Sequence, residues 1–414
     1  MRIAMVSEHA NPLAALGGTD FGGQSVAVAG LALALAERGH EVVVHTRREH
    51  PRQPAFVEIV PGVQVHHVTA GPPRAIPKDQ LVPYLPQFAQ QLTRQWRRNP
   101  PEVVHAHFWM SGLVSAQAAT PLGLPTALTF HALGVVKRRH LGDADTSPPS
   151  RLDAERCLAR CTVAILATAT DEIHELIEMG ADPNAVHLVP CGVDIGHFMP
   201  QGPVAPPRTA AHRLVCLGKL VPRKGVDDAV RMLRWLPDTE LLIAGGPRST
   251  DLDGDDEVRR LREIAAITGV SNRVVFLGGI GRADVPSLLR SADLAVCLPW
   301  YEPFGMVPLE AMACGLPIVG SRVGGLVDTI EDNRTGVLVA PQRPDLAARV
   351  VRGLLANPER LRALARRGPE RVAQKYSWQQ AAARTEAIYA GLIARRRHSS
   401  AGSTAARSAV AVMR

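Results

Sequence analysis

Two glutamates, Glu302 and Glu310, mark the stretch of this sequence best suited to chemistry, the string EPFGMVPLEAMACG. The apolar run DLAVCL before it predicts a buried strand, and the residues from Pro308 to Gly315 predict a helix that ends at the glycine. A strand that enters a glycine-containing loop and then a helix presents unpaired backbone N–H groups at the positive end of the helix dipole. This stretch therefore predicts an anion site.

The two carboxylates add a second property to this site. Either glutamate alone could be a helix cap. A pair around Phe304-Gly305-Met306 favours another role, because carboxylates accept hydrogen bonds from vicinal hydroxyls, as an acidic residue does for ribose in dinucleotide sites. The predicted ligand is a phosphorylated sugar.

Basic side chains follow another predicted strand, in the string HRLVCLGKLVPRKG. Lys219, Arg223 and Lys224 lie in the loop after this strand. Lysine ammonium groups act as mobile point charges, and Lys219 and Lys224 can reach one diphosphate from such a loop. This loop therefore also favours a phosphorylated ligand.

The N-terminal strings RIAMVS, ALGGTDFGG and EVVVHT predict a strand, a glycine-rich loop and a second strand, with a helix over about residues 24 to 38 between the loop and the second strand. This Rossmann-like unit lacks G-x-G-x-x-G, and Thr46-Arg47-Arg48 stands where a NAD ribose needs an acid, so a dehydrogenase is disfavoured. The loop around Gly18 can let a phosphate approach the backbone, with a simple flexible turn as the alternative.

The glutamate string resembles the E-x7-E signature of the family-four (group 1) retaining glycosyltransferases, which use nucleotide-sugar donors. The resemblance implies the α/β class and the GT-B fold, with two Rossmann-like doubly wound parallel-sheet domains facing across a cleft that holds the ligand. In that family the first Glu and the amides after it hold the donor sugar, and the second Glu holds the nucleotide ribose.

Further positions of the donor site follow from the same resemblance. Lys219 stands where the family more often has Arg, with Arg223 as the substitute, and Ile280 follows from its place at a strand end. The predicted donor-binding residues are Gly18, Lys219, Arg223, Lys224, Ile280, Glu302, Phe304, Gly305, Met306, Val307 and Glu310.

Histidines add a candidate catalytic group. In PTALTFHALGVVK, His131 is expected just past the end of a buried strand, where parallel α/β sheets bind ligands. A lone histidine is usually structural, but in the family a His in this context hydrogen-bonds the donor sugar near its reactive carbon. The predicted catalytic residues are therefore His131, Lys224 and Glu302.

The acceptor is predicted from the N-terminal strings GGTDFGGQSVAV, HAHFWMSG and HALGVVK. They look most like the family branch of the inositol-phosphate N-acetylglucosaminyltransferases and sucrose-phosphate synthases, which implies a phosphorylated acceptor. Gln24 and Phe108 stand where that branch tends to have Asn and Tyr. Lys137 and Arg151 are expected in a basic loop that could clamp the phosphate, or could face an anionic membrane or solvent. The candidate acceptor residues are Gln24, His107, Lys137 and Arg151, with His105, His107 and Trp109 expected in a loop after a strand.

The expected chemistry is retaining hexosyl transfer without a metal or other cofactor. Lys219, Lys224 and the helix start would neutralise the leaving diphosphate. The pairs Asp143/Asp145 and Asp251/Asp253 are expected in loops away from these strings, so activity should survive a chelator. Alternatives are a lipid-linked or polysaccharide acceptor, a GT-B epimerase, and a non-catalytic nucleotide-sugar-binding protein; UDP, GDP and ADP sugars all remain open.

Composition limits the partners and the location. The formal net charge is +8 and the aromatic content only 4%, and aromatics do not alternate with basic residues, so no nucleic-acid partner is expected. The first residues predict a strand and not a signal peptide, and no stretch has the roughly 20 apolar residues of a spanning helix. A cytoplasmic protein is expected, with peripheral contact at the inner face of the membrane as an open alternative.

Two domains are needed to place these residues. The string VPCGVDIGHF resembles the usual end of the family's first domain, and PQGPVAPPRTAA after it predicts a hinge. The predicted division is residues 1–200 for the acceptor-side domain, 201–212 for the hinge, 213–375 for the donor-binding domain, 376–395 for a C-terminal helix crossing back to the first domain, and 396–414 for a disordered tail.

Overall fold

The computed structural model describes residues 1–17, 22–204 and 209–399. The chain forms two compact units. The first comprises Met1–Gly192 and the chain from Trp378 onward, and the second comprises Val193–Ser377.

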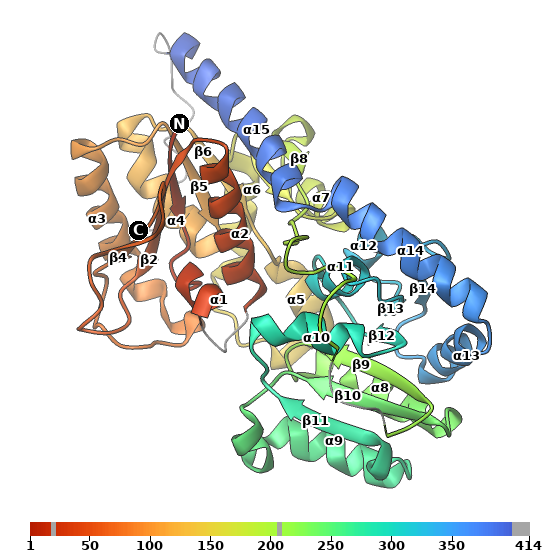
Figure 1. Cartoon of the computed structure of the whole chain (residues 1–414). Helices are drawn as coiled ribbons and strands as arrows, with labels where there is room; N and C mark the ends of the chain where they lie inside the picture. The colour runs from red at the N-terminus through yellow and green to blue at the C-terminus, as the bar shows by residue number, and fades with distance from the viewer. Residues whose placement is uncertain (18–21, 205–208, 400–414) are drawn as a thin grey trace. The chain divides into compact units, whose positions relative to one another are not determined.

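A largely parallel sheet forms the centre of the first unit (Figure 1). Among the described residues its strand order is β3-β4-β2-β1-β5-β6-β7-β8, and only β3 runs antiparallel to its neighbour. Strand β5 is buried along its whole length, as expected of a central parallel strand covered on both faces. The strands are β1 (Arg2–Val6), β2 (Glu41–Arg47), β3 (Phe56–Val60), β4 (Val63–Val68), β5 (Val103–His107), β6 (Thr126–Thr129), β7 (Ile165–Ala167) and β8 (Val186–Leu188).

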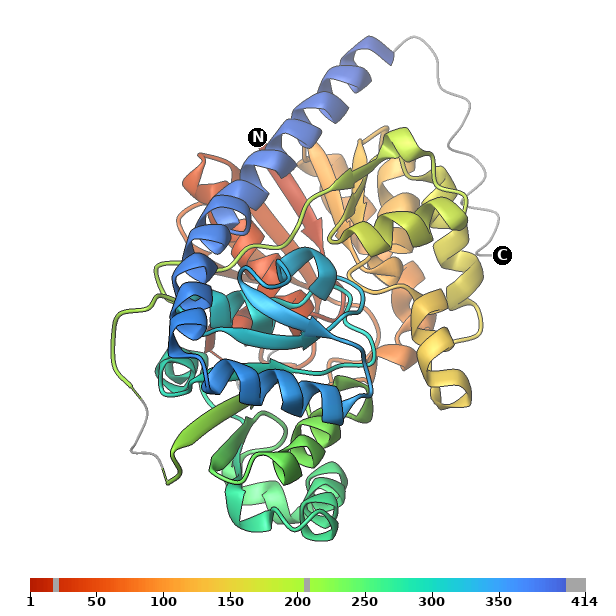
Figure 2. The same cartoon turned by 90° about the vertical axis from the view of Figure 1, so that its right-hand side faces the viewer.

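Helices cover this sheet, and one of them comes from the far end of the chain. The helix α15, dark blue in Figure 2, packs against α2 and β5. Gly30 of α2 makes this close packing possible, because a Cβ at Gly30 would lie 2.1 Å from the Trp378 ring. The helices are α1 (Pro12–Gly17), α2 (Gly23–Glu37), α3 (Leu85–Arg98), α4 (Trp109–Ala119), α5 (Gly134–Leu141), α6 (Arg151–Cys161), α7 (Thr170–Glu178) and α15 (Trp378–Ser399).

The second unit has a fully parallel sheet with the order β11-β10-β9-β12-β13-β14. The strand order reverses between β9 and β12, which is the topological switch point of a doubly wound sheet. Its strands are β9 (His212–Leu217), β10 (Thr239–Ala244), β11 (Val274–Gly278), β12 (Leu294–Cys297), β13 (Ile318–Ser321) and β14 (Gly336–Val339). The helices are α8 (Val226–Met232), α9 (Asp256–Ile267), α10 (Val285–Arg290), α11 (Met306–Ala313), α12 (Leu326–Thr329), α13 (Pro344–Leu355) and α14 (Pro358–Lys375).

The predicted α/β class with two Rossmann-like parallel sheets is confirmed. In the second unit, buried aliphatic side chains of the strands, including Leu214, Ile243, Val296 and Val319, form one core with residues of the covering helices. This core fixes the carboxyl ends of the strands, and the loops that follow them carry the predicted site residues.

The predicted boundary at residue 200 and the hinge at 201–212 differ from the observed division. Val193 already belongs to the second unit, because its N–H donates to Tyr376 O at 2.7 Å. The Pro-rich segment does not separate the units: Arg290 Nε donates to Pro203 O at 2.8 Å within the second unit. The chain passes between the units at Gly192/Val193 and again at Ser377/Trp378.

The C-terminal helix begins at Trp378 and ends at Ser399, so it is longer at its end than the predicted 376–395. The first residues of the predicted tail, 396–399, are helical, and residues 400–414 lie outside the described part of the chain. Within the described residues, no helix is both long enough and apolar enough to cross a bilayer.

Candidate active site

Two loops at the switch point of the second unit bring Lys224 and Glu302 together. One loop follows β9 and the other follows β12, and these strands are neighbours in the sheet. Lys224 Nζ donates to Glu302 Oε2, and the two side chains are 23% and 13% exposed. The structure thus pairs two of the three predicted catalytic residues.

Gly225 allows the two loops to approach so closely. Its φ is +63°, and a Cβ at this position would lie 1.8 Å from Leu298 O. The Trp300 N–H donates to Arg223 O at 2.9 Å and ties the loops together. Any residue with a side chain at 225 would push the loops apart and separate Lys224 from Glu302.

The loop after Glu302 leads into helix α11 as predicted. Gly305 is the N-terminal cap residue with φ +98°, and no side chain of the described residues caps the helix. Phe304 is buried and Met306 and Val307 are half-buried at the first helical positions. The Gly325 N–H donates to Glu302 O at 2.9 Å and holds the loop. The first turn of α11 therefore has the geometry of the predicted anion site.

Glu310 lies one helical turn further and is buried in an ion pair. Arg282 Nη1 lies 2.9 Å from Glu310 Oε1, and the Arg282 guanidinium stacks 5.0 Å from the Phe198 ring centroid. His197 Nε2 lies 3.0 Å from Arg282 O. Burial raises the pKa of Glu310, and Arg282 and His197 oppose this rise. Sequence reasoning missed Arg282 and His197, because Arg282 contacts Glu310, and His197 contacts Arg282, from segments distant in the chain.

The other predicted donor residues of the second unit lie at strand ends. Lys219 is exposed and Arg223 is half-buried in the loop after β9. Ile280 is half-buried just after β11, next to Gly279, whose N–H donates to Pro247 O at 2.7 Å. Gly18 lies outside the described residues. The donor roles of these four residues stay predictions.

In the first unit, His131 follows β6 as predicted. It adopts a left-handed backbone with φ +61°, which is uncommon for a residue with a side chain. His131 Nε2 lies 2.9 Å from His107 Nδ1. His107 is the last residue of β5, so the predicted loop begins only at Phe108, and Trp109 already starts α4. The two histidines meet because β5 and β6 are adjacent parallel strands.

The candidate acceptor residues have structural partners. Gln24 Nε2 donates to Ser7 Oγ and to His107 O, each at 3.2 Å. Lys137 Nζ lies 2.8 Å from Asp145 Oδ1. The predicted basic loop is wrong for this residue, because Lys137 lies in α5.

Arg151, the first residue of α6, is 2% exposed and its Nε lies 2.7 Å from Glu155 Oε1. The guanidinium also donates to Ser147 Oγ and to Ala132 O. Each of its three nitrogens therefore has a protein partner, and the predicted basic loop is wrong for Arg151 as well, because it lies in α6.

Two cations that are far apart in the sequence lie over the ring of Phe108. Lys78 Nζ lies 5.4 Å and Arg151 Cζ 5.0 Å from the centroid of its ring. His9 contacts the same ring edge to face, with centroids 5.0 Å apart. Sequence reasoning missed Lys78, since it lies in a Pro-rich segment with no pattern of its own. Cations gathered at one aromatic ring can bind an anionic ligand with their remaining N–H groups.

No group of three or more metal-ligating side chains occurs within the described ranges. Asp145 is bound by Lys137, and Asp253 Oδ1 accepts from Arg262 Nη1 at 2.6 Å. Both residues thus belong to ion pairs.

Comparisons with known proteins identify the family. The model described as "Glycosyl transferase 4-like domain" matches residues 22–192, and "Glycosyl transferases group 1" matches residues 206–371. The chain belongs to the group 1 glycosyltransferases. A D-inositol 3-phosphate glycosyltransferase of Jonesia denitrificans is 34% identical over 94% of this chain and 95% of its own. A second such enzyme, D-inositol 3-phosphate glycosyltransferase 1 of Catenulispora acidiphila, is 35% identical over 95% of this chain and 96% of its own.

Solved structures agree with this assignment. The sucrose-phosphate synthase of Thermosynechococcus elongatus superposes with a TM-score of 0.86 and 30% identity, over 95% of this chain and 99% of the other. HepE of Anabaena, solved with UDP-glucose, shares the fold with a TM-score of 0.71 at 18% identity, over 94% of this chain and 100% of the other. The predicted GT-B fold and the predicted class, a nucleotide-sugar-dependent glycosyltransferase, are confirmed.

Proposed function

We propose that this transferase moves a hexosyl group, with retention, from a nucleotide sugar to a small phosphorylated acceptor. The observation that carries the acceptor class is the convergence of Lys78 and Arg151 on the Phe108 ring. Two cations held at one aromatic ring match a compact dianion such as a phosphate monoester. Relatives of this chain named for inositol 3-phosphate and sucrose phosphate support the same class.

The donor side has the groups that a departing diphosphate needs. As the bond from the anomeric carbon to the diphosphate oxygen breaks, negative charge grows on that oxygen. Lys224 and the backbone N–H groups at the start of α11 stabilise this charge, and they do so most strongly in the transition state. The acceptor hydroxyl oxygen bonds to the anomeric carbon from the same face, and its proton passes to the leaving phosphate oxygen.

Glu302 and Glu310 hold hydroxyl groups in this proposal. Glu302, held beside Lys224, accepts hydrogen bonds from the donor sugar. Glu310, held by Arg282, accepts from the ribose. His131 orients the sugar, and its neutral ring can do so without repelling the cation that forms at the anomeric carbon.

A donor and acceptor panel tests the proposal. The purified protein is incubated with UDP-, GDP- and ADP-hexoses, with D-inositol 3-phosphate, hexose phosphates or their dephosphorylated forms, and nucleotide release is measured. We expect release to be at least about 10-fold faster with a phosphorylated acceptor, since one charged hydrogen bond contributes about 1.5–3 kcal/mol. In the Lys78→Ala variant, KM for the phosphorylated acceptor should rise by about 10-fold while KM for the donor stays unchanged.

Other outcomes of this panel assign other functions. Release that requires a membrane extract would move the acceptor to a lipid-linked sugar or polysaccharide. Free sugar formed without any acceptor would identify an epimerase, and donor binding without release would identify a binding protein. Each of these results would contradict the proposal.

We further propose that catalysis needs no divalent cation. Lys224 and the α11 start already supply positive charge where the diphosphate leaves, which is the role that a metal has in other transferases. Activity in excess EDTA should stay within about 2-fold of the untreated rate, because no charge is removed from the site. A loss that added Mg²⁺ or Mn²⁺ restores would overturn this mechanism.

A further inference from the structure

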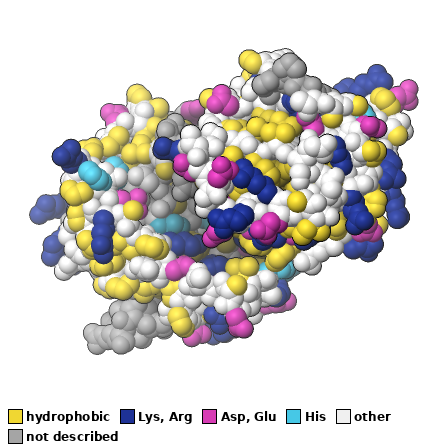
Figure 3. Space-filling view, turned by 90° about the horizontal axis from the view of Figure 1, so that it is seen from below, with side chains coloured by type: hydrophobic (Ala, Val, Ile, Leu, Met, Phe, Trp, Pro, Cys, Tyr) yellow, Lys and Arg dark blue, Asp and Glu magenta, His cyan; other side chains and the backbone are white. Residues whose placement is uncertain are grey.

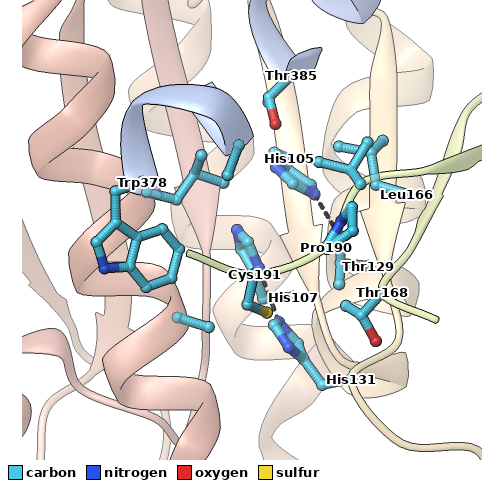
Figure 4. Close-up of a pocket in the computed structure, with 14 residues that line it drawn as sticks. His105, His107, Thr129, His131, Leu166, Thr168, Pro190, Cys191, Trp378 and Thr385 are labelled. Atoms are coloured by element: carbon cyan, nitrogen blue, oxygen red, sulfur yellow. Dashed lines mark hydrogen bonds between the residues drawn. The ribbon is translucent and has the colours of Figure 1, made fainter. Parts of the chain in front are cut away.

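A row of histidines crosses the sheet of the first unit (Figure 4). His105 and His107 lie on β5 with ring centroids 4.1 Å apart, and His107 contacts His131. His105 is fully bonded: its Nδ1 lies 2.6 Å from the Tyr389 hydroxyl and its Nε2 lies 2.9 Å from Thr129 Oγ1. His107 differs, because its Nε2 is buried and has no hydrogen-bond partner among the described residues.

A small cavity lies beside these histidines and the helix α15. Its lining includes His107 and Thr385, whose hydroxyl is likewise buried and without a partner among the described residues. Figure 4 shows both side chains at this cavity, with Thr385 entering from the C-terminal helix. The cavity leaves about 30 Å³ for the centres of water molecules, which is room for one or two.

His107 Nε2 and the Thr385 hydroxyl are the two polar side-chain atoms at this cavity that lack a partner among the described residues. Both nitrogens of His105 are engaged, and the Thr168 hydroxyl, which also lines the cavity, donates to Glu172 Oε2 at 2.8 Å. Two unpaired buried polar atoms at one cavity each cost free energy, and a hydroxyl can donate while a ring nitrogen without hydrogen can accept. One water between them would satisfy both.

Because the histidine rings are neutral, the direction in which each hydrogen bond is donated determines their tautomers. Burial lowers the pKa of His105 and His131 to about 3 and that of His107 well below its usual value. All three rings are therefore neutral near pH 7, and each carries a single N–H. The nitrogen that holds this hydrogen on His107 determines which nitrogen holds it on His131.

We propose that His107 and Thr385 are positioning residues that fix the tautomer of His131 through one internal water molecule. The Thr385 hydroxyl donates to this water, and the water donates to His107 Nε2. His107 then carries its hydrogen on Nδ1 and donates to His131 Nε2. His131 must therefore carry its own hydrogen on Nδ1, where it can donate to an oxygen of the bound sugar.

The functional consequence rests on the proposed role of His131 in orienting the donor sugar. The tautomer of His131 is independent of that proposed role, because it is set inside the first unit by contacts that exist without substrate. The C-terminal helix thus contributes to the site through Thr385, although this residue touches no substrate.

Nuclear magnetic resonance of the full-length protein with isotope-labelled histidine tests this directly, since ring nitrogen shifts distinguish the two tautomers. The signals of His131 and His107 are assigned from His131→Asn and His107→Asn variants. We expect the Nδ1–H form for both residues in the unaltered protein. In Thr385→Val, which keeps the shape but removes the hydroxyl, His131 should become a mixture of tautomers, and kcat should fall about 3- to 10-fold with donor KM within about 2-fold.

Two further variants separate positioning from stability. Thr385→Ser keeps a hydroxyl and should retain the tautomer and kcat. Thr93→Val removes a hydroxyl that bonds only Ala89 O within α3, and should change neither. An Nε2–H form of His131 in the unaltered protein, or an unchanged His131 signal in Thr385→Val, would overturn the proposal.

If Thr385→Val does not fold, a high-resolution crystal structure of the unaltered protein decides the question. A water within hydrogen-bond distance of both His107 Nε2 and Thr385 Oγ1 supports the proposal, and a dry cavity refutes it. If the donor and acceptor panel fails while the tautomer is found as expected, only the proposed function is lost.

Discussion

The Lys224→Met variant should lose about 10²- to 10³-fold in kcat, because removing one preorganised group from the developing charge costs about 2.7–4 kcal/mol. Lys224 is fixed by Glu302 and by the loop contact at Gly225, so it needs no reorganisation when the diphosphate leaves. Steady-state kinetics at saturating donor measure the effect. Donor KM should rise less than kcat falls, because the interaction is strongest in the transition state.

Two control variants show whether the loss in kcat comes from the missing charge of Lys224 or from a general effect of the substitution. Lys224→Arg keeps the charge but changes its geometry, and we expect it to recover part of the lost rate. Lys375→Met removes an exposed lysine at the end of α14 and should leave kcat unchanged. A loss of less than about 10-fold in Lys224→Met would show that another group neutralises the leaving diphosphate.

Glu302→Gln tests the other half of the ion pair. The amide can still accept a hydrogen bond from a sugar hydroxyl, but it lacks the negative charge that attracts the Lys224 ammonium. If the pair acts as a unit, the double variant should be little worse than Lys224→Met alone. Additive losses would instead mean that the two side chains act on separate parts of the donor.

Residues placed directly after buried strands could be predicted from the sequence. His131 and Glu302 follow apolar runs, and the carboxyl ends of parallel strands are where ligands bind. Arg282 and Lys78 could not be predicted in this way. Arg282 meets Glu310, and Lys78 meets Phe108, only through the folded arrangement of the chain, and neither lies in a string that the sequence marks as special.

The domain boundary shows the same limit. A Pro-rich segment at 201–212 has the composition of a hinge, and composition is what the sequence offers. The observed boundary depends instead on the bond from Val193 N to Tyr376 O, which joins segments distant in sequence. Likewise, the C-terminal helix packs on α2 because the Trp378 ring fits against Gly30. The periodicity of apolar residues in the sequence does not reveal such a fit.

The surface charge of the protein bears on the prediction that it has no nucleic-acid partner. On the face shown in Figure 3, Lys and Arg side chains lie among Asp and Glu side chains. Among the described residues many charged side chains belong to ion pairs, such as Arg322 with Asp332 and Arg343 with Asp345. The net charge of +8 thus includes many locally neutralised groups, and the absence of a nucleic-acid partner stays an expectation.

The second large effect is on stability, in the Arg151→Met variant. Arg151 and Glu155 are 2% and 0% exposed, so removing the guanidinium leaves a buried carboxylate without its counter-charge. We expect a loss of about 3–5 kcal/mol in the free energy of unfolding, measured by urea denaturation at pH 7.5. Arg156→Met on the same helix removes an exposed ion pair and should cost no more than about 1 kcal/mol.

The pH dependence of this loss identifies its cause. Burial raises the pKa of Glu155 even with Arg151 in place, and Arg151 opposes this rise. Without the arginine, the folded-state pKa should rise further above the unfolded value. A carboxyl whose pKa is raised on folding stabilises the protein below its unfolded pKa and loses that contribution as the pH rises. The deficit of Arg151→Met should therefore shrink on going from pH 7.5 to about pH 5. A deficit independent of pH would point to lost packing on Phe108 instead.

The double variant Arg151→Met/Glu155→Gln distinguishes a structural role of Arg151 from an acceptor-binding one. The glutamine is neutral, and its amide oxygen can still accept the hydrogen bond that Gly134 N–H gives to Glu155 Oε2 at 2.7 Å. Most of the lost stability should return, because no unpaired buried charge remains. KM for the phosphorylated acceptor should nevertheless stay raised by at least about 10-fold, since the guanidinium on the Phe108 ring is still missing. If KM returned to that of the unaltered enzyme, Arg151 would only support the fold, and Lys78 would be left as the single cation of the acceptor site on Phe108.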